Sequence, residues 1–257
     1  MNRIQKSSVM LLKKTEVLSA LAVRLTKITR KSKTPIHPKH LLDKKPWYLK
    51  YLVKNDNLLD LGCHNGQNTI KASKLVKFAI GVEIDEFALD LARSTANYLK
   101  IKNVSYKLAN LETKLEFPDK TFTKILLLDV LEHLNNRELI LSEIYRILKS
   151  HGLLILGVPN RQTSWKKLQR SAGICSYSDP DHKIEFSENS IKKLLEKAGF
   201  RITYFGYGKF DTPIKGIIDV IGAVSLPLYR RITLWRSKKV LKNPQEASGF
   251  EIVAVKL

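Results

Sequence analysis

The sequence is poor in cysteine and has no long apolar run. Its two cysteines, Cys63 and Cys175, match neither a zinc-binding spacing nor a disulfide-rich framework, so we expect a reducing compartment. No stretch reaches the roughly 20 apolar residues that a membrane-spanning helix needs. The apolar patch near the amino-terminus contains Glu16 and lacks a clear cleavage site, which argues against a signal peptide. We therefore expect a cytoplasmic protein that at most contacts the inner face of a membrane.

Acidic residues are also scarce. The chain of 257 residues carries 45 Lys and Arg against 24 Asp and Glu, a formal charge of +21 at pH 7. Such an excess points to an anionic partner, which could be a phosphorylated or lipid-linked small molecule, membrane headgroups or nucleic acid. Fourteen of the basic residues but only three of the acidic ones precede Asn57, so the excess is concentrated near the amino-terminus.

Residues 1–40 are expected to form a basic amphipathic extension. Large apolar residues recur there at helical spacing: Leu11, Leu18, Leu21, Leu25 and Ile28. Pro35 and Pro38 end the pattern. The sequence leaves three roles open for this helical segment, namely packing on its own domain, lying on a membrane surface, or gripping the substrate.

Residues 41–257 alternate strand patterns with helix patterns. The expected strands are 58–61, 79–83, 104–108, 125–129, 152–158, 200–205 and 250–255. The expected helices are 41–53, 86–98, 137–148 and 187–198. Such alternation is typical of a parallel sheet with helices on both faces. We predict an α/β fold, a Rossmann-like, doubly wound sheet of seven mostly parallel strands.

A long insertion is expected at residues 208–248, between the last two strands. A connection of this length is uncommon in a compact domain and is usually functional. Residues 214–228 are mainly apolar, and a basic run follows: Arg230, Arg231, Arg236, Lys238 and Lys239. This order suits a helical cap over the acceptor side or a surface that inserts at a membrane interface.

The central motif is residues 57–69, Asn-Leu-Leu-Asp-Leu-Gly-Cys-His-Asn-Gly-Gln-Asn-Thr, which predicts a strand, a tight turn and a helix start. Such a turn gathers backbone N–H groups at a helix N-terminus and suits a polar ligand. The dinucleotide fingerprint Gly-x-Gly-x-x-Gly would need glycine at 62, 64 and 67, and only Gly62 fits it.

The other pattern for such a turn is acidic-x-Gly-x-Gly-x-Gly, which Asp60, Gly62 and Gly66 match and from which His64 departs. With this motif the sequence resembles the class I S-adenosylmethionine-dependent methyltransferases over about residues 41–205. Within that family it is most similar to the ubiquinone-biosynthesis-type O-methyltransferases and related glycan or lipid methyltransferases. The resemblance implies S-adenosyl-L-methionine as the cofactor. At position 64 a side chain stands where relatives keep bare backbone.

The resemblance also implies which residues contact the cofactor. Glu83, at the end of the second strand, should accept hydrogen bonds from the ribose, with Asp85 as a substitute. Asn110 and Leu111 should meet the adenine. The full set of expected cofactor residues is Asp60, Gly62, Cys63, His64, Gly66, Glu83, Ile84, Asn110, Leu111 and Asp129.

Two histidines are candidates for the base that removes a proton from an acceptor hydroxyl. His182 is the first candidate and His133 the second, because imidazole titrates near neutral pH. By the same resemblance, Asp129, Glu132 and His133 match a cluster that some relatives use for a divalent cation. The same residue types occur in relatives without metal, so we expect no metal and keep this site as the minority alternative.

The sequence therefore predicts an S-adenosylmethionine-dependent methyltransferase that O-methylates a glycan, lipid-linked or lipophilic hydroxy acceptor, with peripheral membrane contact. One alternative is an RNA methyltransferase whose basic surface follows phosphates. No Asn-Pro-Pro-Tyr follows residues 125–129 and the aromatic residues form no stacking platform, so nucleic acid is the less favoured partner. A non-catalytic cofactor-binding protein is the other alternative. The sequence does not define the oligomeric state.

Overall fold

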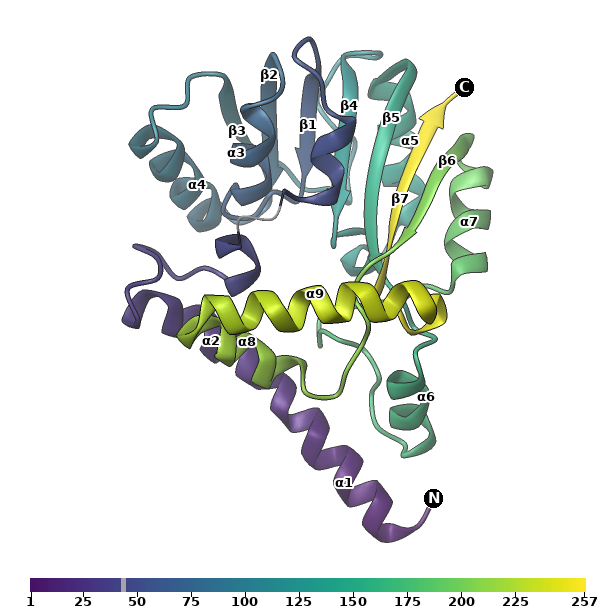
Figure 1. The fold of residues 1–257 in the computed structure, drawn as a ribbon. Helices are drawn as coiled ribbons and strands as arrows, with labels where there is room; N and C mark the ends of the chain where they lie inside the picture. The colour runs from purple at the N-terminus through teal and green to yellow at the C-terminus, as the bar shows by residue number, and fades with distance from the viewer. Residues whose placement is uncertain (43–44) are drawn as a thin grey trace. The chain divides into compact units, whose positions relative to one another are not determined.

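The computed structural model describes residues 1–42 and 45–257, which form two compact units (Figure 1). Unit 1 joins three separate stretches: Met1–Lys44, Pro159–Glu185 and Tyr207–Gly249. Unit 2 comprises Lys45–Val158, Phe186–Gly206 and Phe250–Leu257. The amino-terminal extension thus shares a unit with the insertion at 208–248, a different partition from the consecutive domains 1–40 and 41–257 that the sequence predicts.

Unit 2 is built on a seven-stranded sheet in the order β3-β2-β1-β4-β5-β7-β6. Its strands are β1 (Asn57–Leu61), β2 (Phe78–Glu83), β3 (Val104–Leu108), β4 (Phe122–Leu128), β5 (Leu148–Pro159), β6 (Phe200–Tyr207) and β7 (Gly249–Lys256). The neighbouring pairs among β1 to β5 are all parallel. Strand order reverses between β1 and β4, as in doubly wound sheets. The predicted Rossmann-like sheet of seven mostly parallel strands is confirmed.

The helices of unit 2 begin and end close to their predicted positions. They are α3 (Gln67–Ser73), α4 (Glu86–Tyr98), α5 (Arg137–Ile147) and α7 (Glu188–Lys197), with short 3-10 turns η3 (Trp47–Tyr51) and η4 (Leu131–His133). Side chains fix three of the starts. Asn136 accepts from Leu139 N at the start of α5. Asp85 accepts from Phe87 N and Ala88 N at the start of α4, and Ser187 forms a capping box with Ser190 at the start of α7.

The helix predicted over residues 41–53 is wrong for the part that the structure describes. η2 (Pro38–Leu41) ends where that helix should begin, and η3 is a single short turn. Residues 43 and 44 lie outside the described residues. Pro46 explains the difference, because proline has no N–H to donate and disfavours helical geometry in the residue before it.

β1 is an interior strand of the sheet. Leu58, Leu59 and Leu61 are fully buried, and β2 and β4 flank the strand on either side. A continuous apolar run is typical of a parallel strand that is covered on both faces. The turn that follows Leu61 therefore lies at the carboxyl edge of the sheet, between the ends of β2 and β4.

Unit 1 is mainly helical. It contains α1 (Arg3–Lys14), η1 (Thr15–Val17), α2 (Leu18–Ile28), η2, α6 (Ser164–Ser171), α8 (Lys215–Val224), α9 (Leu226–Lys242) and η5 (Pro244–Glu246). α2 packs against α8, with Ala22 and Ala223 fully buried and Thr29 Oγ1 donating to the backbone oxygen of Ala223 at 2.8 Å. The helical extension and the long insertion are therefore parts of one core.

A buried carboxylate links the elements of unit 1. Asp219 of α8 accepts from Ser19 Oγ of α2 at 2.6 Å and from Tyr229 Oη of α9 at 3.3 Å. His37 Nε2 lies 3.3 Å from the same carboxylate. Burial alone would raise the pKa of Asp219, but the hydrogen bonds from His37 and Ser19 outweigh burial and lower it. The carboxylate therefore stays charged and joins three elements.

The insertion divides into a buried helix and an exposed one. α8, which holds most of the apolar run at 214–228, buries Ile218, Gly222 and Ala223 within unit 1. α9 instead exposes large apolar side chains next to basic ones. Arg236 is an exception in the basic run, because it is buried and its Nε donates to the backbone oxygen of Phe210 at 2.8 Å.

α8 approaches η1 so closely that only glycine fits at position 216. A Cβ there would lie 2.0 Å from the backbone oxygen of Thr15. We expect Gly216→Ala to lower the unfolding free energy by about 2 kcal/mol, the usual size for overpacking, in a chemical denaturation experiment. Gly157→Ala is the matched control, since its methyl would meet Leu128 at an ordinary 3.5 Å. Equal stability of the two variants would contradict the close approach.

Candidate functional site

The predicted cofactor residues of unit 2 lie where four neighbouring strands end. Gly62 follows β1, Glu83 ends β2, Asn110 lies just beyond β3 and Asp129 follows β4. These four strands are adjacent and parallel, so their carboxyl ends share one edge of the sheet. Doubly wound sheets bind ligands at this edge, where the strand order reverses.

The turn after β1 is tight and left-handed. Gly62, His64 and Gly66 have φ of 71°, 47° and 73°. A Cβ at Gly62 would lie 2.5 Å from Val130 Cγ2, and one at Gly66 would lie 2.6 Å from Tyr106 Oη. Both positions therefore require glycine. His64 adopts the same backbone region at a cost of about 1 kcal/mol, which it tolerates because its neighbours hold the turn.

The Glu83 carboxylate closes this turn. Its Oε2 accepts from His64 N at 2.9 Å, and its Oε1 accepts from Ile84 N at 2.7 Å. A carboxylate has about four acceptor sites, so it can also accept from sugar hydroxyls. Asp85, the substitute that the sequence allows, caps α4 instead. Glu83 is therefore the better placed of the two acids for a ribose.

Asp60 supports the turn from inside the protein. Its side chain is 2% exposed and accepts from Thr69 Oγ1 of α3 at 2.6 Å. Burial, and to a lesser degree the nearby charge of Glu83, raises the pKa of Asp60 to about 7 against the opposing hydrogen bond from Thr69. Asp60 thus ties β1 to α3, and it reaches a ligand only through the turn that it supports.

The other predicted cofactor residues divide by exposure. Ile84 and Asn110 are exposed, and the Asn110 side chain accepts from Glu112 N at 2.9 Å to form the turn after β3. Cys63 and Leu111 are buried. Burial raises the pKa of the Cys63 thiol, which keeps it neutral. The buried pair can therefore contact a ligand mainly through backbone atoms.

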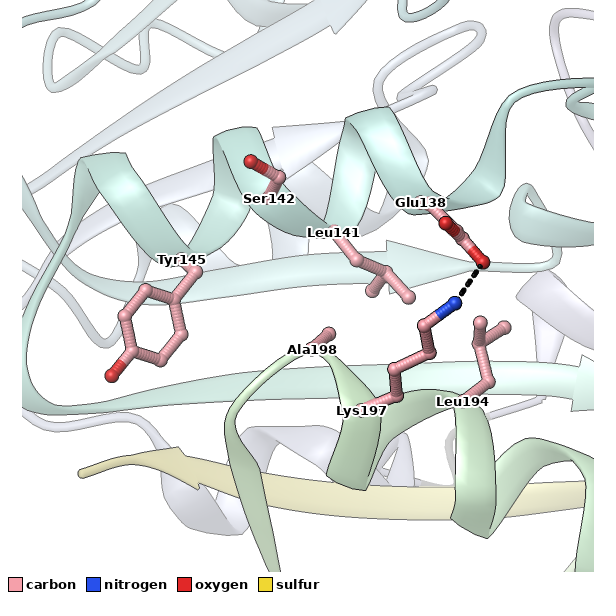
Figure 2. A pocket seen from close by; sticks show the side chains of 7 residues that line it. All are labelled: Glu138, Leu141, Ser142, Tyr145, Leu194, Lys197 and Ala198. Carbon is pink, nitrogen blue, oxygen red and sulfur yellow. Dashed lines mark hydrogen bonds and ion pairs between the residues drawn. The ribbon is translucent and has the colours of Figure 1, made fainter.

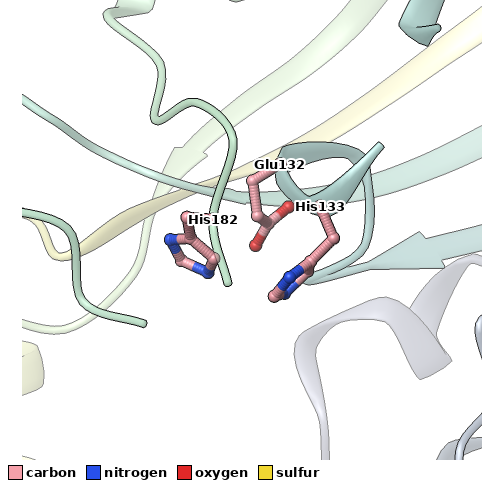
Figure 3. Close-up of side chains that lie close together, drawn as sticks. All are labelled: Glu132, His133 and His182. Atoms are coloured by element: carbon pink, nitrogen blue, oxygen red, sulfur yellow. The ribbon is translucent and has the colours of Figure 1, made fainter. Parts of the chain in front are cut away.

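The segment after β4 begins with a second left-handed residue. Asp129 has φ of 58° and donates its N–H to the backbone oxygen of Gly157 at 3.0 Å. Glu132 and His133 follow in η4, Glu132 buried and His133 half-buried (Figure 3). Figure 3 also labels His182, which belongs to unit 1. A metal held by Asp129, Glu132 and His133 stays the minority alternative to the prediction of no metal.

His182, the first candidate base, contacts an acidic residue of unit 1 that is itself paired with a lysine. Its Nδ1 lies 3.1 Å from Glu185 Oε1, and Glu185 Oε2 accepts from Lys166 Nζ of α6 at 2.5 Å. Sequence reasoning missed both partners. The His-x-x-Glu spacing could have indicated Glu185, but nothing in the sequence joins Lys166 to it.

A separate groove lies between α5 and α7 of unit 2 (Figure 2). Its volume is about 340 Å³, and it is lined by Glu138, Leu141, Ser142, Tyr145, Leu194, Lys197 and Ala198. Its two charged residues form an exposed ion pair at 2.9 Å, an interaction that contributes little to stability. None of the predicted site residues lines this groove, so it is not the candidate site.

A protein-family model described as a methyltransferase domain matches residues 52–199. That stretch includes β1 to β5, the glycine turn and α7. The match therefore covers the strand ends that gather the predicted cofactor residues.

Curated relatives match a similar part of the chain. A probable S-adenosylmethionine-dependent methyltransferase of Mycolicibacterium smegmatis is 27% identical over 146 residues, which is 57% of this chain and 52% of that protein. A ubiquinone biosynthesis O-methyltransferase of Pelagibacter ubique is 28% identical over 109 residues, 42% of this chain and 44% of that protein. The chain thus spans about half the length of the curated relatives it matches.

A solved structure extends the likeness in fold. The crystal structure of an S-adenosylmethionine-dependent methyltransferase from Methanosarcina mazei has a TM-score of 0.58 and 24% sequence identity. The match covers 84% of this chain and 99% of that one. This likeness supports the fold.

The raised pKa of Asp60 predicts a pH dependence of stability. In the unfolded chain this carboxyl loses its proton near pH 4, whereas in the folded chain it keeps the proton to about pH 7. Between these values unfolding releases a proton, so Asp60 lowers stability as pH rises, by up to about 4 kcal/mol in total. Asp60→Asn should reduce the change of the denaturation midpoint with pH between pH 4 and pH 7. Asp90→Asn, at an exposed carboxylate, should leave that change as it is in the parent. If the denaturation midpoints of Asp60→Asn and of the parent change with pH in the same way, the prediction is contradicted.

Proposed function

The chain belongs to the methyltransferase domain family, and from that premise we propose that it transfers the methyl group of S-adenosyl-L-methionine to a hydroxyl oxygen of a small-molecule acceptor. The observation that carries the proposal is the left-handed turn from Gly62 to Gly66, closed by the Glu83 carboxylate at the carboxyl edge of the sheet. Family and fold imply S-adenosyl-L-methionine as the cofactor.

The residues at this edge fit that cofactor. The turn accepts only glycine at positions 62 and 66, which lets a ligand approach the backbone closely. Glu83 supplies acceptor oxygens for the ribose hydroxyls, and Asn110 with the backbone of Leu111 supplies polar groups for the adenine edge. We assign Asp129 to contact with the methionine portion of the cofactor. The cofactor supplies a methyl group that its sulfonium already activates.

The chain's own contribution is alignment and proton removal. Holding the acceptor oxygen in line with the methyl group makes a bimolecular reaction effectively unimolecular. The hydroxyl proton must then pass to a base. We assign this role to His182, with His133 as the second choice.

The acceptor that the chain's chemistry favours is an anionic glycan, lipid-linked or lipophilic hydroxy compound. The formal charge of +21 favours an anion. The name of the Pelagibacter ubique relative refers to ubiquinone biosynthesis and O-methylation, which supports transfer to oxygen.

Peripheral contact with an anionic membrane is proposed for α9. The helix has no acidic residue, and its exposed apolar residues include Trp235, 54% exposed, and Leu241, 78% exposed. Basic residues accompany them on exposed positions: Arg230, Arg231, Lys238 and Lys242. Apolar side chains with Trp beside Lys and Arg suit the headgroup boundary of a bilayer. Exposed aliphatic residues have no evident use on an RNA-tracking surface, so α9 favours lipid over nucleic acid.

None of the helices in the described residues is long and apolar enough to cross a membrane.

Cofactor binding tests the reaction class. Glu83→Ala should weaken binding of S-adenosylhomocysteine, measured by calorimetry, by about 2–3 kcal/mol, because charge-assisted hydrogen bonds are lost. Glu86→Ala, an exposed acid of the next helix, is the matched control and should leave affinity unchanged. Binding of NADH without any binding of S-adenosylhomocysteine to the parent protein would overturn the proposal.

Co-sedimentation with vesicles of phosphatidylglycerol and phosphatidylcholine tests the role of α9. Replacing Arg230, Arg231, Lys238 and Lys242 by Gln should reduce vesicle binding at least about 100-fold, since each basic residue near an anionic surface contributes on the order of 1 kcal/mol. Arg236 is left intact because it is buried.

The matched control removes the same charge from exposed lysines of unit 2: Lys74, Lys77, Lys102 and Lys193. The control should keep most vesicle binding, and both variants should keep S-adenosylhomocysteine affinity. Absence of vesicle binding in the parent, or equal loss in both variants, would reject a specific lipid surface. Binding to bulk tRNA that the α9 changes abolish would favour the RNA alternative.

A further inference from the structure

The two amino-terminal helices of unit 1 expose a row of large aliphatic side chains. α1 and α2 follow one another with only the short turn η1 between them. The exposed fractions along this segment are 78% for Ile4, 68% for Leu11, 74% for Val17, 45% for Leu21 and 73% for Ile28. Single exposed apolar residues are ordinary, but a row of them along two consecutive helices marks an interaction surface.

On α1 the aliphatic residues lie on the face opposite the one that packs on unit 1. Ile4 and Leu11 are seven positions apart and therefore share one side of the helix, whereas Val9, the buried residue of α1, lies on the other side. Val9 packs with Trp165 and Ala172 of unit 1. Contact with unit 1 therefore leaves the face of Ile4 and Leu11 uncovered.

The same division holds for α2. Its inner face carries Ala22 and Thr26, both fully buried. Its outer face carries Leu21 and Ile28, again seven positions apart, with the exposed Arg24 between them. The aliphatic row of α1 therefore has a counterpart on α2, and basic residues accompany it.

The charge of this surface has one sign. Its exposed basic residues are Arg3, Lys6, Lys14, Arg24, Lys27 and Arg30. Glu16 is the only acidic residue among residues 1–42, and unit 1 uses it internally. Its carboxylate accepts from Trp165 Nε1 and Gln169 Nε2, each at 3.3 Å, and pairs with Lys13 Nζ at 2.6 Å. The surface that α1 and α2 present outward is therefore aliphatic and cationic.

We propose that α1, η1 and α2 lie in the headgroup region of an anionic lipid bilayer, with the aliphatic row inserted and the basic residues at the lipid phosphates. An apolar face flanked by Lys and Arg is the arrangement of a helix that lies in the plane of a membrane interface. The inserted face is already exposed, so insertion leaves the contacts of Val9 and Glu16 with unit 1 unchanged. The inference adds a second surface to the lipid contact proposed for α9, and it rests on that proposed function for the class of partner.

Nucleic acid and a second copy of the chain fit this surface less well. Residues 1–42 contain no Phe, Tyr or Trp on which a base could stack. In a symmetric pair of copies the same patch faces itself, which would bring basic residues of both copies together. An anionic bilayer is complementary to both the aliphatic and the basic side chains.

A fluorescent probe attached to single cysteines tests the orientation of the two helices. Cys175→Ser removes the exposed native thiol, and Cys63 is buried. An environment-sensitive dye is then attached at Leu11→Cys or Ile28→Cys, and at Glu196→Cys on exposed α7 as the control. With phosphatidylglycerol vesicles, emission from positions 11 and 28 should shift to the blue and be quenched by brominated acyl chains. Emission from position 196 should not change.

Co-sedimentation with vesicles of phosphatidylglycerol and phosphatidylcholine measures what the aliphatic row contributes. The row variant replaces four side chains by Ser and keeps the charge: Ile4, Leu11, Leu21 and Ile28. It should bind vesicles at least about 10-fold more weakly, because the apolar area that inserts is lost. The matched control replaces four exposed aliphatic residues of unit 2 by Ser and should bind as the parent: Val53, Leu75, Leu99 and Leu257.

The outcomes separate this inference from the proposed function. Unchanged emission at positions 11 and 28 on vesicles that the labelled proteins bind overturns the inference and leaves the contact of α9 standing. Equal vesicle binding by the row variant and the parent also overturns it, as does self-association in sedimentation velocity that only the row variant loses. If the row variant loses helicity by circular dichroism, the labelled single-cysteine variants decide. S-adenosylhomocysteine binding by calorimetry without vesicles tests the methyl transfer separately, and the row variant should retain it.

Discussion

The hydrogen bond from the backbone of His64 to the Glu83 carboxylate is the contact on which the candidate site depends. It joins the turn after β1 to the end of β2, and two further N–H groups of that turn bond to Val82 O at 2.8 and 2.9 Å. Together they hold a chain of left-handed residues that would otherwise relax. Asp60 and Val130 support the same turn from its protein side. The cofactor residues that follow β2, β3 and β4 lie at the ends of the parallel strands beside this turn.

The sheet could be predicted because its signals are local. The apolar run of β1 indicates a strand buried on both faces, and the caps at Asp85 and Ser187 mark helix starts within one turn of the chain. The helix predicted over 41–53 failed for a local reason as well, since Pro46 was outweighed by the surrounding apolar pattern. Where neighbours in sequence decide the structure, the local pattern carries the information, provided that proline is given its full weight.

Contacts between distant parts of the chain could not be predicted in this way. The hydrogen bond between Ser19 and Asp219 joins residues 200 positions apart. The expected site residues were chosen by motif, and the motif does not distinguish a carboxylate that faces a ligand from one that supports the turn. In the same way a run of basic residues gave no sign that Arg236 is buried while its neighbours are exposed.

The packing of α2 against α8 has a consequence for how the chain is made. α8 follows α2 by roughly 190 residues. At a synthesis rate of 5–20 residues per second, α8 leaves the ribosome roughly 10–40 s after α2. During that interval Ala22 and Ser19 lack the partners that later bury or bond them, while β1 to β6 of unit 2 are being synthesised. The synthesis of α8 therefore sets the earliest time at which α2 can reach its final packing.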